Sequence, residues 1–200
     1  NKSGHLNNYG KTIYYSDPIT EFVGKTFDQQ ITLVGHSLGA TTAIEVSANI
    51  PEKIKNLLLV DPPWYPLNSE NIETQSTNST IRKEGEFFQR EKPKWRTAID
   101  AVTAFKNNYP EKFREDPYLT AIRAIYVFHH DINIWNVDSN WIWHNAPQLA
   151  KNITANTILL GGNPNKGSLM SKDIAKLVKN EIENCEIIFW DTGHGIPREK

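Results

Sequence analysis

The sequence lacks several features, and each absence narrows what the protein can be. Its 200 residues include one cysteine, Cys185, so an internal disulfide is excluded and a reducing, cytoplasmic compartment is expected. Apolar runs are short, as at residues 57–60 and 157–160, and none can span a bilayer. The formal net charge is −1, with acids and bases interspersed, which favours neither nucleic acid nor a membrane surface as a partner.

Signals for export and for common cofactors are missing as well. No charged segment followed by an apolar stretch opens the chain, so we expect no signal peptide. There is no phosphate-binding loop of the Gly-x-x-x-x-Gly-Lys type. His129, His130 and Asp131 are adjacent, but neighbouring residues of a helix point to different faces, and no second cluster completes a metal site. We therefore expect a protein without a metal or a cofactor.

The sequence does contain an α/β pattern at both ends of the chain. Short apolar segments predict four buried strands, at residues 30–35, 54–60, 157–160 and 186–190. Apolar residues at helical spacing predict helices at residues 17–27, 38–49 and 171–182. Ser171 is expected to cap the last of these helices. A helical connection of about 20 residues joins the first two strands, so these strands are expected to be parallel.

The middle of the chain, residues 64–156, has a different character. Ser, Thr and Asn dominate residues 67–80, which predicts a loop. Apolar residues punctuated by prolines predict four helical segments, at residues 81–90, 95–107, 118–129 and 146–151. Most of the aromatic side chains there are expected to pack between these helices. The sequence thus predicts a first core part (1–63), a helical lobe (64–156) and a last core part (157–200).

A Gly-x-Ser-x-Gly motif follows the first predicted strand, as Gly35-His36-Ser37-Leu38-Gly39. In such a motif the chain turns sharply from strand to helix and exposes the serine hydroxyl, which calls for small residues two places before and two after the serine. We therefore expect Ser37 to be a nucleophile. The N–H of Leu38, at the start of the helix, is expected to stabilise an oxyanion.

His194 is the candidate general base. Among the six histidines it alone follows a predicted strand and has a glycine on each side, in Gly193-His194-Gly195. A serine hydroxyl is a weak nucleophile until a neutral imidazole accepts its proton. The carboxyl ends of parallel strands lie at one edge of a sheet, so Ser37, Asp61 and His194 are expected there together.

These segments resemble the α/β-hydrolase superfamily. The resemblance rests on residues 31–40, which include the serine motif, on Leu57-Leu-Leu-Val-Asp61 and on Trp190-Asp-Thr-Gly-His-Gly195. It implies a parallel-sheet α/β-hydrolase core, with a helical cap inserted after the strand that follows the nucleophile helix. It also implies an esterase-like enzyme of the hydrolase class that uses a catalytic triad and no cofactor.

The opening residues fit the same family. Ser3-Gly4-His5, followed by residues 9–12, is similar to the Gly-His-Gly-x-Ser segment that follows strand four of the family's sheet. The resemblance then implies that only the C-terminal strands are present, and that the loop giving the second oxyanion donor is absent from this sequence. A chain with half a sheet and an exposed edge is not expected to fold well or to turn over substrate alone.

The acid of the expected triad departs from the family's pattern. The family usually places an Asp or Glu after the next-to-last strand, where this chain has the neutral Asn163 and Asn165. Some members carry the acid after the strand that follows the nucleophile helix, which is the place of Asp61. A carboxylate there would fix the tautomer of His194 and stabilise its imidazolium. Asp61 can equally be structural, and Asp173, a Ser–His dyad or an orienting asparagine stay open.

The leading hypothesis is a serine hydrolase that cleaves a small or medium ester, or a related carbonyl compound, through an acyl-enzyme. His36 and Trp64 are expected to line its substrate pocket. C–C bond hydrolysis, lactone opening and acyl transfer use the same Ser–His pair, whereas a nucleophilic serine argues against epoxide and haloalkane hydrolysis. The alternative is a non-catalytic, ligand-binding member with a degraded triad, suggested by the asparagine-rich loop after Gly162. Either protein would have a small molecule as its partner.

Overall fold

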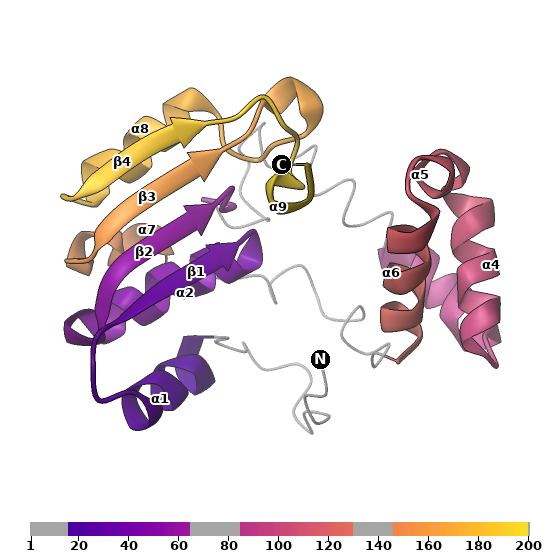
Figure 1. Cartoon of the computed structure of the whole chain (residues 1–200), viewed down its shortest axis with the longest axis horizontal. Coiled ribbons are helices and arrows are strands. Elements are labelled where there is room, and N and C mark those ends of the chain that lie inside the picture. The colour runs from indigo at the N-terminus through magenta and orange to yellow at the C-terminus, as the bar shows by residue number, and fades with distance from the viewer. Residues whose placement is uncertain (1–15, 65–84, 130–145, 200) are drawn as a thin grey trace. The chain divides into compact units, whose positions relative to one another are not determined.

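Four parallel strands form one sheet in the structure, a computed structural model that describes residues 16–64, 85–129 and 146–199. The strands are β1 (Ile31–His36), β2 (Ile54–Val60), β3 (Asn156–Gly161) and β4 (Cys185–Phe189). Their order across the sheet is β1-β2-β3-β4, and each neighbouring pair is parallel (Figure 1). The predicted fold class is confirmed, and the strands begin and end within one residue of their predicted bounds.

Helices precede, connect and follow these strands along the chain. They are α1 (Ser16–Thr26), α2 (Leu38–Asn49), α7 (Ala146–Leu149), α8 (Lys172–Glu181) and α9 (Ile196–Glu199). Short 3₁₀ turns lie between them, at η1 (Pro51–Lys53), η5 (Ala150–Asn152) and η6 (Pro164–Lys166). The capping prediction is also confirmed, because the Ser171 hydroxyl accepts a hydrogen bond from the N–H of Ile174 at the start of α8.

The apolar core of the sheet-bearing part lies on the side of the sheet that α2 and α8 cover (Figure 1). Leu59 and Leu159 are paired across β2 and β3 and are completely buried, together with Ile44 of α2. Successive side chains of a strand point to opposite faces. Val34 and Ile158 consequently lie on the other face, where they are 59% and 38% exposed. Burial thus follows the period of two that a strand imposes.

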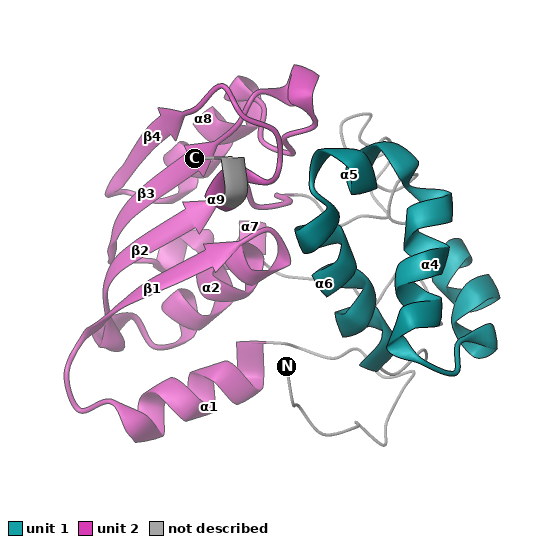
Figure 2. Cartoon of the chain, turned by 45° about the vertical axis from the view of Figure 1, so that its right-hand side comes forward, with its two compact units in different colours: residues 1–11, 79–138 teal, residues 12–78, 139–200 magenta. Residues whose placement is uncertain are grey.

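A second compact unit contains only helices among its described residues (Figure 2). It comprises a helical stretch at residues 85–91, η2 (Lys92–Lys94), α4 (Ala98–Asn108), α5 (Pro110–Glu115) and α6 (Pro117–His129). The sequence pattern did not predict the short helix α5. A cluster of aromatic rings forms the core of this unit, and the ring centroid of Phe105 lies 5.7 Å from those of Phe87 and Phe88. These aromatic side chains therefore pack between helices, as predicted.

Chain contacts divide the protein into two units, residues 1–11 with 79–138 and residues 12–78 with 139–200 (Figure 2). Helix α7, which the sequence placed in the helical lobe, belongs to the second group and contacts α2. The domain boundaries after residues 63 and 156 stay a prediction. The opening segment with Ser3-Gly4-His5, the loop expected at residues 67–80, and the pair His130 and Asp131 lie outside the described residues.

Two absences hold for the described stretches of chain. No helix there has the length and apolar character that crossing a membrane requires. No group of three or more His, Cys, Asp or Glu side chains there is arranged to hold a metal ion. The cytoplasmic location expected from the single cysteine stays a prediction.

The two faces of β3 give a direct test of this core. Leu159→Ala is expected to lower the free energy of unfolding by about 3 kcal/mol, because it leaves a cavity at a completely buried position. Ile158→Ala, one residue earlier on the opposite face, is expected to cost less than about 1 kcal/mol. Urea unfolding of both variants measures the difference. Equal losses would contradict the described orientation of the strand.

Candidate active site

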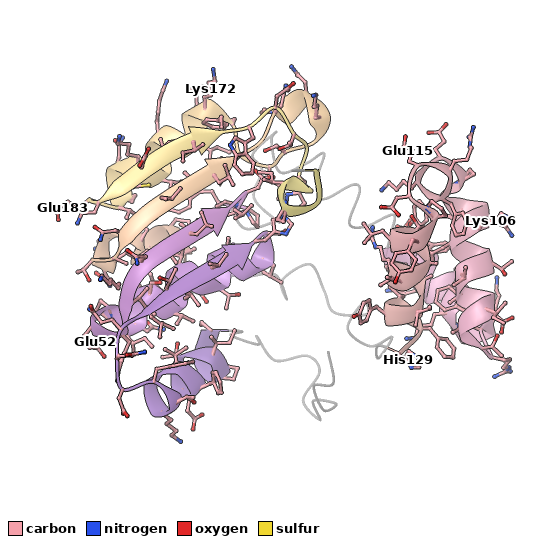
Figure 3. All side chains as sticks on the ribbon, viewed as in Figure 1. Glu52, Lys106, Glu115, His129, Lys172 and Glu183 are labelled. Carbon is pink, nitrogen blue, oxygen red and sulfur yellow. The ribbon has the colours of Figure 1, made fainter. Side chains whose placement is uncertain are left out.

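The carboxyl ends of all four strands lie at one edge of the sheet (Figure 1). Ser37 comes directly after β1, Asp61 directly after β2, and His194 shortly after β4. Glu52 and Glu183 lie at the opposite edge, where the strands begin (Figure 3). The parallel sheet therefore brings the three residues singled out from the sequence to the same edge.

Hydrogen bonds continue the sheet beyond its strand ends. The N–H of Ser37 donates to the carbonyl of Val60 at 2.9 Å, and the N–H of Asp61 donates to the carbonyl of Leu160 at 2.8 Å. Each of these backbone groups is thus tied to the neighbouring strand. As a result, the positions of Ser37 and Asp61 are set by the sheet.

Ser37 has a strained backbone conformation. Its φ is 57° and its ψ is −128°, a backbone conformation that residues other than glycine rarely adopt. The strand-to-helix turn is tight, because a Cβ atom added to Gly35 would lie 2.6 Å from the Cα of Ala40 and closer still to the carbonyl oxygen of Gly39. A Cβ atom on Gly39 would meet nothing within 4 Å. The expected need for a small residue therefore holds for Gly35 but not for Gly39.

The imidazole of His194 joins the serine to the carboxylate. Its Nε2 lies 2.9 Å from the Ser37 Oγ, and its Nδ1 lies 2.7 Å from the Asp61 Oδ2. Since the carboxylate only accepts hydrogen bonds, Nδ1 carries a proton and, in the neutral ring, Nε2 is free to accept one from the serine. The His194 side chain is 33% exposed, so this ring can be reached from solvent.

Asp61 is completely buried and is the acceptor of four hydrogen bonds. Its Oδ1 accepts from the Ser168 hydroxyl at 2.6 Å and from the Met170 N–H at 2.9 Å. Its Oδ2 accepts from the Leu169 N–H at 2.9 Å and from His194. Four donors around two oxygens fit an ionised carboxylate, which has acceptor sites only. These bonds also help to hold the backbone of Asp61 itself, which has a positive φ of 45°.

The remaining candidates for the acid lie elsewhere. Asp173 is 90% exposed and pairs with Lys176. The side-chain oxygen of Asn163 accepts from the Asn165 N–H at 3.0 Å, and its amide donates to Asp191 at 2.8 Å. The structure therefore brings Asp61, and none of these other carboxyl or amide groups, against the imidazole Nδ1.

His36 lies in contact with His194. Its Nε2–H donates to the backbone carbonyl of His194 at 2.8 Å. The two ring centroids are 4.8 Å apart with an angle of 33° between the planes. His36 thus supports the position of the histidine loop, and its predicted part in a substrate pocket stays a prediction.

Leu38 and Trp64 occupy different environments. Leu38 is the first residue of α2, and the first N–H groups of a helix have no acceptor within that helix. Trp64 is 4% exposed and belongs to the buried core of the sheet-bearing unit. The oxyanion role of Leu38 and the pocket role of Trp64 both stay predictions.

Cys185 offers no competing nucleophile at neutral pH. Burial raises the pKa of its thiol to about 11, so the reactive thiolate is scarce. The thiol also lies at the start of β4, far along the strand from the edge that holds His194. Among the described residues, the serine hydroxyl next to an imidazole is therefore the group suited to nucleophilic attack.

Sequence reasoning missed the groups that hold Asp61. Ser168, Leu169 and Met170 lie in the loop after β3, the loop in which the acid itself was sought. Their part depends on one hydroxyl and two backbone N–H groups, and backbone groups leave no signal in a sequence. The only hint was a serine placed shortly after Gly161-Gly162.

Comparisons with known proteins agree with this fold. A sequence model of the family described as the alpha/beta hydrolase fold matches residues 3–84 of the chain. No curated protein matches the chain by sequence. Solved structures, however, resemble it over nearly its whole length.

Three of these structures illustrate the likeness. A marine microorganism esterase has a TM-score of 0.71 at 14% identity, covering 100% of this chain and 76% of that chain. The thioesterase domain from the curacin biosynthetic pathway has a TM-score of 0.58 at 19% identity, covering 96% and 71%. The enol-lactonase from Burkholderia xenovorans LB400 has a TM-score of 0.58 at 15% identity, covering 98% and 73%. At these identities the likeness establishes the fold and leaves the activity to be argued from the site.

The two glycines of the serine motif make a matched test of the turn. Gly35→Ala is expected to lower the free energy of unfolding by more than about 2 kcal/mol, because its Cβ meets backbone atoms that cannot move aside cheaply. Gly39→Ala is expected to change it by less than about 1 kcal/mol, since its Cβ enters open space in a helix. Thermal or urea unfolding compares the two. A tolerated Gly35→Ala would argue against the tight turn.

Proposed function

The chain has the fold of the α/β-hydrolase superfamily, and from this premise we propose that it is a serine hydrolase. The observation that carries the proposal is the unbroken hydrogen-bonded series from the Ser37 hydroxyl through His194 to the buried Asp61. A nucleophile, a base within hydrogen-bond distance and a group that orients the base are the parts that acyl transfer requires. In this proposal Ser37 is the nucleophile, His194 the general base and Asp61 the acid of the triad.

The reaction proceeds in two halves. As the Ser37 Oγ bonds to the substrate carbonyl carbon, its proton passes to the His194 Nε2, and the oxyanion accepts a hydrogen bond from the Leu38 N–H. His194 then gives this proton to the leaving oxygen as the C–O bond breaks, which leaves an acyl group on the serine. Water attacks this acyl group while His194 accepts a proton from the water. His194 then gives this proton to the Ser37 Oγ as the bond between the acyl carbon and Oγ breaks, which releases the carboxylic acid and regenerates Ser37 and the neutral imidazole.

The substrate proposed is a small or medium ester, or a related carbonyl compound, with an apolar part. The neighbours in structure support this class, because their names include an esterase, a thioesterase and an enol-lactonase. All three act at an acyl carbon next to a heteroatom, which is the chemistry that a Ser–His pair supplies. C–C bond hydrolysis and acyl transfer would use the same residues and differ in the leaving group or the acceptor.

The alternative of a non-catalytic ligand-binding protein rests on one observation, the lack of an acid in the loop after Gly162. This observation carries less weight in the structure, because Asp61 approaches His194 from the end of another strand. The asparagines of the loop instead bond to each other and to Asp191. The hydrolase proposal is therefore the one that the contacts favour.

A fluorophosphonate probe tests the nucleophile. The full-length protein is expected to be labelled at Ser37 and to hydrolyse p-nitrophenyl acetate or butyrate. Ser37→Ala is expected to lose the label and to lower kcat by about 1,000-fold or more. The control is the unfolding curve, which this small exchange should leave nearly unchanged. Ligand binding without any labelling of Ser37 would sink the hydrolase proposal.

The acid has its own test, with a matched exchange of the same kind. Asp61→Asn is expected to lower kcat by about 1,000-fold or more, because the amide no longer fixes the imidazole tautomer or stabilises its charged form. Asp173→Asn, on the surface of α8, is expected to leave kcat within about twofold. Steady-state kinetics of both variants decide the assignment. A larger loss in Asp173→Asn than in Asp61→Asn would overturn it.

A further inference from the structure

A loop far from Asp61 in the sequence holds its carboxylate. Ser168 lies 107 residues further along the chain, and its hydroxyl oxygen is 2.6 Å from the Asp61 Oδ1. The next two residues, Leu169 and Met170, turn their N–H groups onto the same carboxylate, each at 2.9 Å. Three consecutive residues thus supply three of the four donors around a side chain that is completely buried. The fourth donor is His194.

The direction of the Ser168 hydrogen bond is determined by its other partners. The Ser168 oxygen accepts from the Gly162 N–H at 3.0 Å and, at 3.3 Å, from the Met170 N–H. A hydroxyl has one hydrogen and two acceptor sites, so with both acceptor sites directed at N–H groups its hydrogen is left for Asp61. A charge-assisted hydrogen bond of this short length is among the stronger ones in proteins.

The same loop also holds the histidine segment. The N–H of Asn163 donates to the carbonyl of Thr192 at 2.7 Å, and Lys166 pairs with Asp191 at 2.9 Å. Gly162 permits this close approach, because a Cβ atom there would lie 2.5 Å from the Thr192 carbonyl oxygen. The loop after β3 consequently fixes the acid and the base relative to each other.

We propose that Ser168 is a positioning residue for the acid: its hydroxyl donates to the Asp61 Oδ1 and holds the Oδ2 toward His194. The loop in which the family usually carries the acid would then supply the donors that hold an acid located on the neighbouring strand. This inference rests on the proposed function, since it describes how the proposed triad is held. It adds a residue that does not touch the substrate and acts through Asp61.

The expected consequence is a change in pH dependence, and not only in rate. Without the Ser168 hydroxyl, the Asp61 carboxylate attracts a proton more strongly, so the Asp61–His194 pair takes up its inactivating proton at higher pH. The acidic limb of the kcat/KM profile is therefore expected to move up by about one pH unit. The kcat at the optimum is expected to fall about tenfold, with KM nearly unchanged.

The experiment compares three variants of the complete protein. Ser168→Ala removes the hydroxyl, and Ser168→Cys keeps a side chain of the same shape with a much weaker donor, so it serves if the alanine variant does not fold. Ser171→Ala is the matched control, because it removes another hydroxyl from the same segment, one that caps α8 and is not among the four donors to Asp61. For each variant, kcat and KM for a p-nitrophenyl ester are measured as functions of pH, and an unfolding curve is recorded.

A shift of the acidic limb in Ser168→Ala or Ser168→Cys, and none in Ser171→Ala, supports the proposal. A loss of rate with the limb unmoved in both Ser168 variants would overturn it, because a merely structural hydroxyl lowers the active fraction without changing the titration.

Proton NMR separates this proposal from the proposed function. The His194 Nδ1–H that donates to Asp61 is expected to give a far-downfield resonance, whether or not the protein hydrolyses any ester tested. Suppose that the protein shows this resonance, that Ser168→Cys moves or abolishes it, and that no esterase activity is found. The hydrolase proposal then fails, while the role of Ser168 stands. A resonance unaffected by both Ser168 exchanges would instead refute the role of Ser168.

Discussion

The hydrogen-bonded imidazole of His194 is the contact on which the site depends. It links a serine 157 residues away and an aspartate 133 residues away in the sequence. No local structure can close such distances, so the contact exists only because β1, β2 and β4 run parallel in one sheet and end at one edge. The backbone of His194 is further held by His36, whose Nε2–H donates to the carbonyl of His194. Every chemical role proposed for the site requires this ring to stay where it is.

Strain and support occur together at this edge. Ser37 and Asp61 are the two residues other than glycine with positive φ in the described part of the chain. Such conformations cost of order 1–3 kcal/mol each, and they persist where surrounding contacts determine them. Here the N–H of each residue is bonded to the next strand, and the Asp61 carboxylate is surrounded by donors. A carboxylate that is buried, as that of Asp61 is, needs such donors, because hydrogen bonds must replace the water that an ionised group loses on burial.

Much of the fold was readable because its signals are local. Apolar strand segments and the helical spacing of α2 set the element bounds to within about a residue, and the Gly-x-Ser-x-Gly motif indicated the abrupt turn at Ser37. The helix α5 was missed, because six residues after Pro110 give too little periodicity to recognise. The four-residue helix α7 groups with the sheet by its contacts, and so short a helix carries no mark in the sequence of the unit it packs against.

The sequence by itself determined the α/β pattern, the nucleophile candidate and the base candidate, because each depends on residues that are neighbours along the chain. It left the acid undecided, since the order of residues along the chain does not decide between Asp61 and the candidates after β3, which are Asn163, Asn165 and Asp173. Only the tertiary structure places the Asp61 carboxylate 2.7 Å from the imidazole, which supports Asp61 as the proposed acid, and only the tertiary structure shows the hydrogen bond from Ser168. The physical reason is that hydrogen bonds depend on the direction and separation of atoms from distant strands, and two of the three donors from that loop are backbone N–H groups that any residue except proline possesses.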